Sequence, residues 1–376
     1  MATVELVREH AEVAERAWAL PAQIPELDGI RGLAILLVLA CHSTMWLPAS
    51  GFRDICEQGK VGVDLFFVLS GFLITGILLD SRKQAGALPT FYIRRALRIW
   101  PLYFSYLTIS FLMFGRMMPV HFSRWAYVLF AQNFFYWISM GPFLDPTWSL
   151  AVEEQFYVVW PWIALRVRRE RVLKICCAVL GMAPVIRLAF RLAGAGPAFI
   201  YGNTLCRLDG IAMGGMLAAW VRDARFEVAG LKRLARVGLV AGIVGVGGCC
   251  AGMPFGLELR YSFVTLAFAG VFAFTLLTQG TESPLARMLR SSALTGLGRI
   301  SFALYLFNLP IYGMVHGHAA GRVVAELPYA IAEFIRTAAA TSLLWASATL
   351  SWRMFESRLL RLKDRWAPQP AELKLM

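Results

Sequence analysis

The most regular feature of the chain is a series of long apolar runs separated by short segments that carry charge. Each run has roughly 17 to 22 residues, the length that an α-helix needs to cross about 30 Å of hydrocarbon. The pattern predicts an all-α polytopic membrane bundle. The ten expected spans are about 29–47, 61–79, 100–115, 149–165, 173–193, 204–221, 237–253, 261–279, 299–316 and 329–352.

The composition agrees with this pattern. Of the 376 residues, 58% are hydrophobic and 16% are charged, whereas soluble domains have about 45–50% apolar and about 25% charged residues. We therefore expect one membrane domain over 26–356, preceded by a cytoplasmic segment, 1–25, and followed by a cytoplasmic tail, 357–376. The seven cysteines form no C-x-x-C pair, so we expect neither a disulfide framework nor a metal site.

The net charge of +13 is concentrated in the connections between the apolar runs. One alternating set of connections holds 23 lysines and arginines, and the other set holds 6. By the positive-inside rule the first set is cytoplasmic, and so are both termini. These clusters suit orientation in the cell (inner or plasma) membrane and contact with anionic lipid. No nucleic-acid-binding motif is visible, so the expected partner is the lipid bilayer.

A weaker apolar run lies in the connection 116–148, between two spans whose ends fall on the same, outer side. A segment between them cannot cross the membrane once without breaking the alternation. We therefore expect Trp125–Ile138 to form a short helix at the outer face or a re-entrant helix. Its Trp125, Tyr127, Tyr136 and Trp137 suit the membrane interface.

Charged side chains inside a span are costly, so each one is a candidate functional residue. Arg31 and His42 are eleven residues apart in the first span, which places them within roughly 20° on one helix face and about 16 Å apart in depth. The sequence alone also permits a simpler role for His42, as a packed residue or a hydrogen-bonding residue of the bundle.

Carboxylates gather at a similar depth in the outer half. Asp64 opens the second span, where it either caps the helix or accepts a hydrogen bond from the second ring N–H of His42, which would fix the tautomer and raise the basicity of the ring. Glu153 and Glu154 start another span and point about 100° apart, so we expect one to face the bundle and the other the headgroups. The helix dipole also stabilises acidic residues at helix N-termini, so this position alone does not require a catalytic role.

Arginines form three further groups. Arg94 and Arg98 share a helix face by their i, i+4 spacing, beside Arg95, and they suit phosphates or merely set the orientation. Arg187 and Arg191 suit an anionic substrate or a lipid phosphate. Arg207 and Asp209 are two residues apart, so each should have a different partner. The three groups are Arg94, Arg95 and Arg98; Arg187 and Arg191; and Arg207 with its neighbour Asp209.

A base with carboxylate support suits proton removal from a hydroxyl, and a cytoplasmic array of arginines suits a phosphorylated donor. The same charges would serve a transporter of protons or of an anionic solute. A third alternative is an inactive membrane scaffold. Turnover of a phosphorylated donor by the purified protein separates an enzyme from a transporter, since a carrier should show none.

Four motifs in the first 160 residues resemble those of the acyltransferase 3 family of integral-membrane O-acyltransferases. They lie in family order, and the later part of the chain matches more loosely, through Arg207–Gly210 and Ile300–Leu306. The four motifs are Glu26–Ala34 running to His42, Gly62–Ile74, Phe91–Tyr103 and Thr147–Tyr157.

The resemblance implies transfer of an acyl group, commonly acetyl, from acyl-CoA to a hydroxyl of a glycan, a lipid-linked sugar or a glycosylated metabolite. It implies His42 as the catalytic residue, either as a base or as a transiently acylated group, with Glu153 and Asp64 as supporters. The resemblance also implies that the donor is bound by Arg31, Arg94, Arg95 and Arg98. The candidates for acceptor binding are Trp148, Glu154, Arg207 and Asp209, and substrate choice is expected in the outer connections 116–148 and 317–328.

The chain departs from the family pattern at Asn308, where members often carry histidine after the Tyr-Leu of the late motif. Asparagine donates and accepts hydrogen bonds but does not titrate, which argues against a mechanism with a second histidine. The chain also ends soon after its last expected span. We therefore expect no appended extracytoplasmic domain of the kind that some members carry.

Overall fold

The apolar runs fold as helices in a computed structural model that describes residues 24–115, 124–135, 143–317 and 327–367. No strand occurs in these ranges. The long helices are α2 (Pro25–Ser43), α4 (Gly62–Asp80), α5 (Ala87–Phe114), α7 (Thr147–Arg166), α8 (Arg169–Leu192), α10 (Thr204–Trp220), α11 (Val228–Cys250), α12 (Gly256–Thr278), α14 (Ser292–His316) and α15 (Tyr329–Ser351). The short elements are α3 (Gly51–Glu57), η1 (Gln58–Val61), α6 (Arg124–Val128), η2 (Gln132–Phe135), α9 (Pro197–Gly202), α13 (Pro284–Leu289), η4 (Trp352–Glu356) and α16 (Ser357–Trp366).

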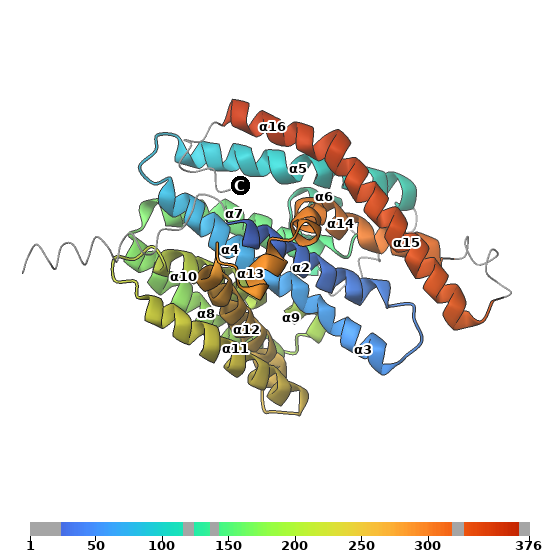
Figure 1. The fold of residues 1–376 in the computed structure, drawn as a ribbon, viewed down its shortest axis with the longest axis horizontal. Coiled ribbons are helices and arrows are strands. Elements are labelled where there is room, and N and C mark those ends of the chain that lie inside the picture. Colours follow the sequence, from blue (N-terminus) through green and yellow to red (C-terminus); the bar gives the residue numbers. More distant parts are fainter. Residues whose placement is uncertain (1–23, 116–123, 136–142, 318–326, 368–376) are drawn as a thin grey trace, which may run out of the picture.

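Each long helix overlaps one of the expected spans (Figure 1). Within the described ranges, six helices are long and apolar enough to cross a membrane by length and composition. Those six include α4, α5, α8, α11, α12 and α14, whereas α10 has only 17 residues. The all-helical, multi-pass architecture is confirmed. The count of ten crossings and the cytoplasmic side of both termini stay predictions.

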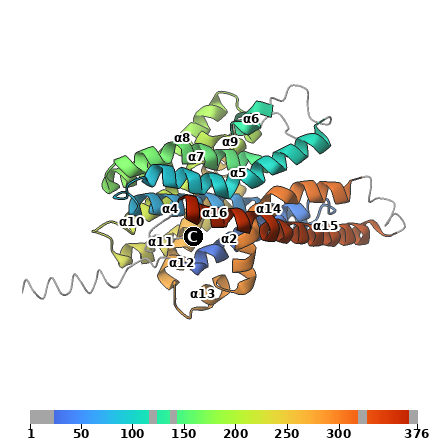
Figure 2. The same ribbon diagram turned by 90° about the horizontal axis from the view of Figure 1, so that it is seen from above.

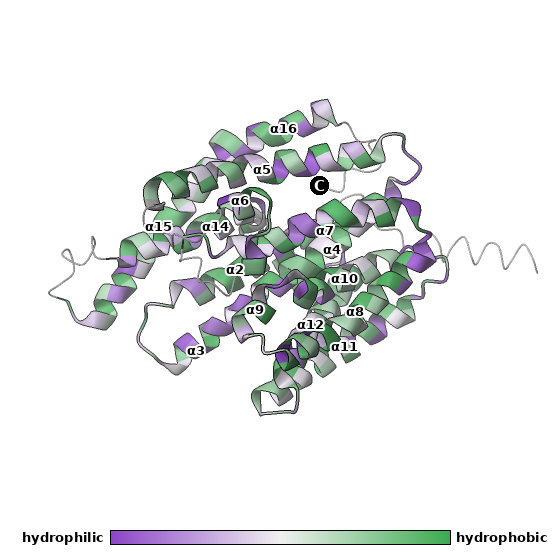
Figure 3. Cartoon of the chain, turned by 180° about the vertical axis from the view of Figure 1, so that it is seen from behind, coloured by the Kyte–Doolittle hydropathy of each residue, from purple (hydrophilic) through white to green (hydrophobic). Residues whose placement is uncertain are grey.

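Helices α8 and α11 present apolar surface outward. Fewer than a quarter of the residues in their most apolar windows are buried, and hydrophobic colouring follows most of their length in Figure 3. On α11 the exposed side chains include Val237, Val240 and Val244, which lie on one face by their spacing. Such a stripe is unfavourable in water but is normal against lipid tails.

The centre of the bundle depends on close contacts between backbones. A Cβ added at Gly71 of α4 would collide with the carbonyl oxygen of Ile211, and one added at Gly214 of α10 would collide with that of Val68. Small residues allow helices to approach this closely in a membrane. Helices α14 and α15 also run side by side (Figure 2).

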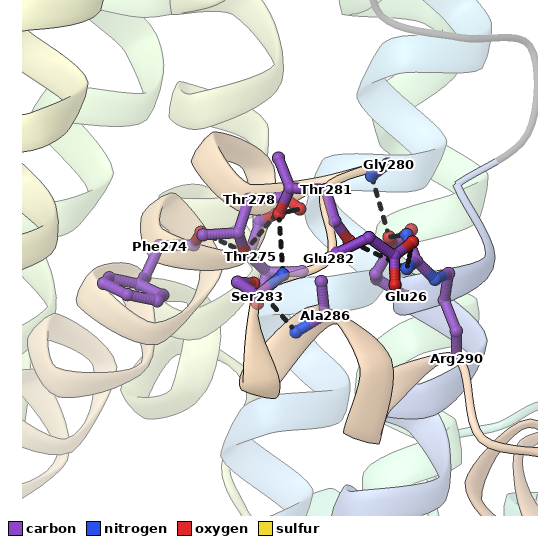
Figure 4. Close-up of polar contacts among 10 residues, drawn as sticks. All are labelled: Glu26, Phe274, Thr275, Thr278, Gly280, Thr281, Glu282, Ser283, Ala286 and Arg290. Atoms are coloured by element: carbon purple, nitrogen blue, oxygen red, sulfur yellow. Dashed lines mark hydrogen bonds and ion pairs between the residues drawn. The ribbon is translucent and has the colours of Figure 1, made fainter.

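The start of α2 is fixed by the connections that follow α12. Glu26 is buried, and its carboxylate accepts hydrogen bonds from the backbone N–H of Gly280 at 3.0 Å and from Arg290 at 3.2 Å (Figure 4). In the same connection Ser283 caps α13 by accepting from the N–H of Ala286. These contacts hold the helix that carries Arg31 and His42 in register with α14.

The expected single helix over Trp125–Ile138 is wrong in its described part. Two short elements, α6 and η2, replace it. The helical path is interrupted between them at Phe130, whose φ is 52°. Trp125 is 71% exposed, as an interfacial residue should be, but Tyr127 is buried against the bundle. Tyr136, Trp137 and Ile138 lie outside the described residues.

The two ends of the chain are described only in part. The expected cytoplasmic segment 1–25 lies almost wholly outside the described residues. The tail begins with α16, which lies beside α5 (Figure 1). Arg94 near the start of α5 donates to the carbonyl oxygen of Ala367 at 2.8 Å, so the tail is attached to the helix that carries the arginine cluster.

Candidate active site

A cavity of about 110 Å³ lies inside the bundle, among α2, α4, α5, α7 and α14. Three guanidinium groups line it, those of Arg31, Arg95 and Arg98, together with one carboxylate, that of Glu153. These charges come from three helices, so the fold gathers them from three separate motifs of the sequence. The other polar lining residues are Ser70, Ser149, Tyr157, Ser301 and Tyr305.

The carboxylate of Glu153 is held in place at the cavity wall. It accepts a hydrogen bond from Ser70 at 2.7 Å and one from Tyr157 at 3.3 Å. Glu154 points elsewhere, as the 100° rotation per residue predicts. It accepts from the indole N–H of Trp100 at 3.1 Å and is 7% exposed. The expectation that one of the two faces the headgroups is therefore wrong, because both carboxylates accept hydrogen bonds from neighbouring helices and Glu154 is buried.

The arginines of α5 divide between two surroundings. Arg95 lies over the ring of Tyr157, with its guanidinium carbon 5.7 Å from the ring centroid, and it lines the cavity with Arg98. Arg94, expected to share a ligand-facing surface with Arg98, is instead turned to Ala367 and is not among the lining residues. On α2, Arg31 donates to Asp28 at 2.6 Å and also lines the cavity.

His42 lies at the far end of α2 and makes a hydrogen bond to Asn308 of α14. Its Nδ1 is 2.6 Å from the Oδ1 of Asn308. The amide nitrogen of Asn308 donates to the carbonyl oxygens of Leu304 at 3.1 Å and Tyr305 at 2.6 Å. Both amide hydrogens are thereby used, so Oδ1 must act as the acceptor and Nδ1 must carry the proton. The lone pair of the imidazole is then on Nε2, as a general base requires.

The His42–Asn308 pair lies one helical turn from the cavity. His42 is not among the residues that line the cavity, but Tyr305 is, and Asn308 follows Tyr305 by three positions on α14. Tyr305 also exchanges a hydrogen bond of 2.6 Å with Ser149 of α7. The arginines and the histidine thus stand at two depths of one bundle, as the Arg31–His42 spacing predicts.

Asp64 does not support His42 through Nδ1, because Asn308 occupies that nitrogen. The carboxylate of Asp64 instead accepts from Arg207 at 2.7 Å, and both side chains are almost fully buried. The guanidinium carbon of Arg207 also lies 4.1 Å from the ring centroid of Tyr261 and 5.7 Å from that of Trp148. Trp148 is buried beside this ion pair and is not among the cavity-lining residues.

Asp209 has a different partner from Arg207, as their spacing predicts. It accepts from Arg187 at 2.9 Å, and Arg191 pairs with Glu258 at 2.6 Å. Arg187 is thus buried in an ion pair, whereas Arg191 is half exposed, and binding of an anionic substrate group or a lipid phosphate by these arginines stays a prediction.

The contact that Asn308 makes could not be predicted from the sequence. There it is recognisable only as a residue that differs from the histidine common in the family. Its partner lies 266 positions away. Ser70 and Tyr305 lie inside segments that resemble the family, but no rule of residue spacing identified either one as a site residue. Among the described residues, no group of three or more His, Cys, Asp or Glu side chains could hold a metal ion.

The chain is similar to curated O-acetyltransferases. The chain is 27% identical to the peptidoglycan O-acetyltransferase OatA of Listeria monocytogenes over 315 residues, which are 77% of this chain and 49% of that protein. It is 26% identical to the O-acetyltransferase OatA of Staphylococcus aureus over 367 residues, which are 90% of this chain and 57% of that protein.

The chain thus spans about half the length of these curated relatives. No solved structure matches it. The model of the acyltransferase domain, in contrast, matches residues 24–352, which include every helix from α2 to α15. The chain therefore belongs to the acyltransferase 3 family, a family of transferase enzymes.

Proposed function

We propose that this protein is a membrane O-acyltransferase that moves an acyl group, most simply acetyl, from acyl-CoA to a hydroxyl of a glycan. The observation that carries the proposal is the cationic cavity one helical turn from a histidine whose tautomer is fixed. The names of the relatives support an acetyl group and a glycan acceptor such as peptidoglycan. A lipid-linked sugar and a glycosylated metabolite remain further acceptors to test.

The charge of the cavity suits a phosphorylated donor. Arg31, Arg95 and Arg98 outnumber Glu153, so the lining is positive. At about 110 Å³ the cavity is smaller than the roughly 300 Å³ at which ordinary ligand pockets begin. It therefore suits the slim acyl end of the donor. The phosphates of CoA would stay near the start of α5, where guanidinium groups bind them well.

The reaction needs one proton to move twice. Nε2 of His42 takes the proton of the acceptor hydroxyl, whose oxygen attacks the thioester carbonyl. The C–S bond then breaks, and the CoA sulfur leaves and receives the proton from His42. Donors aimed at the developing oxyanion lower the barrier of such a step. The hydroxyl of Tyr305, which lines the cavity one turn before Asn308, is a candidate for such a donor.

Asn308 acts in this scheme as a positioning residue. Asn308→Ala is expected to lower kcat by about 10- to 100-fold, by analogy with the loss of a residue that orients a metal-bound histidine. The KM for acyl-CoA should stay unchanged. Asn308→Asp still accepts from Nδ1–H and should keep a larger share of kcat than alanine does. Equal losses in both variants, with a raised KM, would contradict the positioning role.

Arg98 is expected to contribute to donor binding. Arg98→Gln should raise the KM for acyl-CoA by about tenfold or more, because a hydrogen bond to a charged group contributes about 1.5–3 kcal/mol. The control is Lys83→Gln, an exposed cation in the connection before α5. Steady-state kinetics at varied acyl-CoA check this. A fall in kcat at constant KM would remove Arg98 from the donor site.

The proposed function is tested by the ester content of surface glycans. Cells that express the protein should carry base-labile acyl groups on peptidoglycan or other surface glycans above the level of an empty-vector control. Mass spectrometry of the released glycans identifies both the acyl group and the hydroxyl. Equal ester content in a host whose glycans include the acceptor of the relatives, with the protein present in its membranes, would contradict the proposal.

A further inference from the structure

A second and larger cavity opens at one end of the bundle, where three connections meet. We call it the α8 basin. Its volume is about 800 Å³, within the range of about 300–1,000 Å³ that is typical of ligand sites. Six cations line it, Arg82, Arg168, Arg169, Arg171, Lys174 and Arg225, against the two carboxylates Glu170 and Asp223. None of these residues lines the cavity of the candidate active site.

Two walls of the α8 basin are held in place by the fold. Arg82, after α4, donates to the carbonyl oxygens of Ala164 at 2.8 Å and Val167 at 2.6 Å, at the end of α7. Asp223, after α10, accepts from the backbone N–H of Arg225 at 2.9 Å and from its side chain at 3.1 Å. The basin is therefore built from fixed backbone and does not depend on a single loop.

The positive charge of the α8 basin is poorly compensated. Helix α8 begins at Arg169, and its first turns carry Arg171 and Lys174 as well. Cations at a helix N-terminus are opposed by the helix dipole, whereas an anion there is favoured. Burial and the nearby charge of Arg169 lower the pKa of the Arg82 guanidinium. An anion in the basin would relieve both effects.

The position of the basin indicates where such an anion comes from. Helices α4, α7 and α10 end there and α8 begins there, so the basin lies at the depth of lipid headgroups. Trp162 is near the end of α7, and its ring centroid lies 4.4 Å from the guanidinium carbon of Arg166. Trp220 is the last residue of α10. Tryptophan favours this depth, and basic pockets between helices bind anionic headgroups.

We infer that the α8 basin is a binding site for phosphate groups and that an anionic phospholipid headgroup is their source. The inference does not rest on the proposed function, because the basin shares no residue with the candidate active site. Soluble diphosphates, including the one in acyl-CoA, have the same chemistry. The experiment therefore has one arm for each source.

The test compares two triple variants of the full chain in detergent. Arg168→Gln, Arg171→Gln and Lys174→Gln remove three exposed cations from the basin. Lys232→Gln, Arg233→Gln and Arg236→Gln remove three exposed cations from α11 and serve as the charge-matched control. The midpoint of thermal unfolding is followed as phosphatidylglycerol, phosphatidylcholine or inorganic pyrophosphate is added.

Phosphatidylglycerol should stabilise the wild type and the control, and phosphatidylcholine should not. The basin variant should need at least about tenfold more phosphatidylglycerol for the same shift, since three of the six cations that attract the headgroup are removed. Equal loss of affinity in both triple variants would overturn the inference. Stabilisation by pyrophosphate without any by phosphatidylglycerol would overturn the lipid source.

Discussion

Replacement of His42 by alanine is expected to lower the rate of acyl transfer by about 100- to 10,000-fold, the usual contribution of a general base. The loss should fall on kcat, because His42 is not among the residues that line the donor cavity. Initial rates of the purified protein at saturating acyl-CoA check this. Size-exclusion chromatography shows whether the variant stays folded and monodisperse.

A neighbouring change on the same helix provides the control. The hydroxyl of Ser43 donates to the carbonyl oxygen of Ala40 at 3.3 Å, a local bond within α2. Ser43→Ala should therefore keep nearly the full rate. A His42→Ala variant that retains a rate within about threefold of the wild type would show that the histidine only packs or bonds within the bundle, because such a loss corresponds to less than about 1 kcal/mol.

Replacement of Asp64 by alanine is expected to destabilise the fold by about 3–5 kcal/mol, the usual result of removing one partner of a buried ion pair. The guanidinium of Arg207 is 1% exposed, and its bond to Asp64 measures 2.7 Å. Without that carboxylate the charge of Arg207 stays buried without its ion-pair partner. Unfolding of the purified protein by heat or denaturant measures the change in free energy of unfolding.

Two further variants identify the cause of that loss. Asp64→Asn combined with Arg207→Leu should recover part of the stability, because removing both charges avoids an unpaired one. Glu170→Ala breaks an exposed pair with Arg168, 3.7 Å long, and should change stability by less than about 1 kcal/mol. If Asp64→Ala proves as stable as the wild type but loses transfer, Asp64 supports catalysis directly, as the sequence suggested.

The helices were predictable because their signal is local. Runs such as 61–79 and 261–279 match α4 and α12 within a few residues, since apolar length alone selects a spanning helix. The segment around Phe130 was not predictable in this way. Its break depends on a backbone with φ of 52° and on the burial of Tyr127, and no hydrophobic period encodes either feature.

The sequence predicted those members of the candidate site that carry a charge. Arg31 and Glu153 were named as candidates because ionic groups inside spans are costly, and Arg95 and Arg98 because an arginine cluster in a cytoplasmic connection suits phosphates. The cavity brings these four residues together. The pairings between helices were not predictable. The spacing of Arg207 and Asp209 required different partners, but a rule about neighbours on one helix cannot identify Asp64, 143 positions away.

Asn308 shows the same limit in the opposite direction. The residue type excluded a second base, since an amide does not titrate. Its contribution came into view only with its two bonds to Leu304 and Tyr305, which leave its oxygen to face His42. At the position where family members often carry histidine, this chain thus has Asn308, a hydrogen-bond acceptor that fixes the tautomer of His42.

The most direct measurement uses inside-out membrane vesicles from cells that express the protein, supplied with acetyl-CoA labelled in the acetyl group. The vesicles contain the host's own membrane-bound glycan acceptors, and the donor reaches the face predicted to be cytoplasmic. We predict base-labile label on glycan with the wild type and background label with His42→Ala at equal membrane level. Label on glycan that is equal in wild type, His42→Ala and empty-vector vesicles would contradict the account.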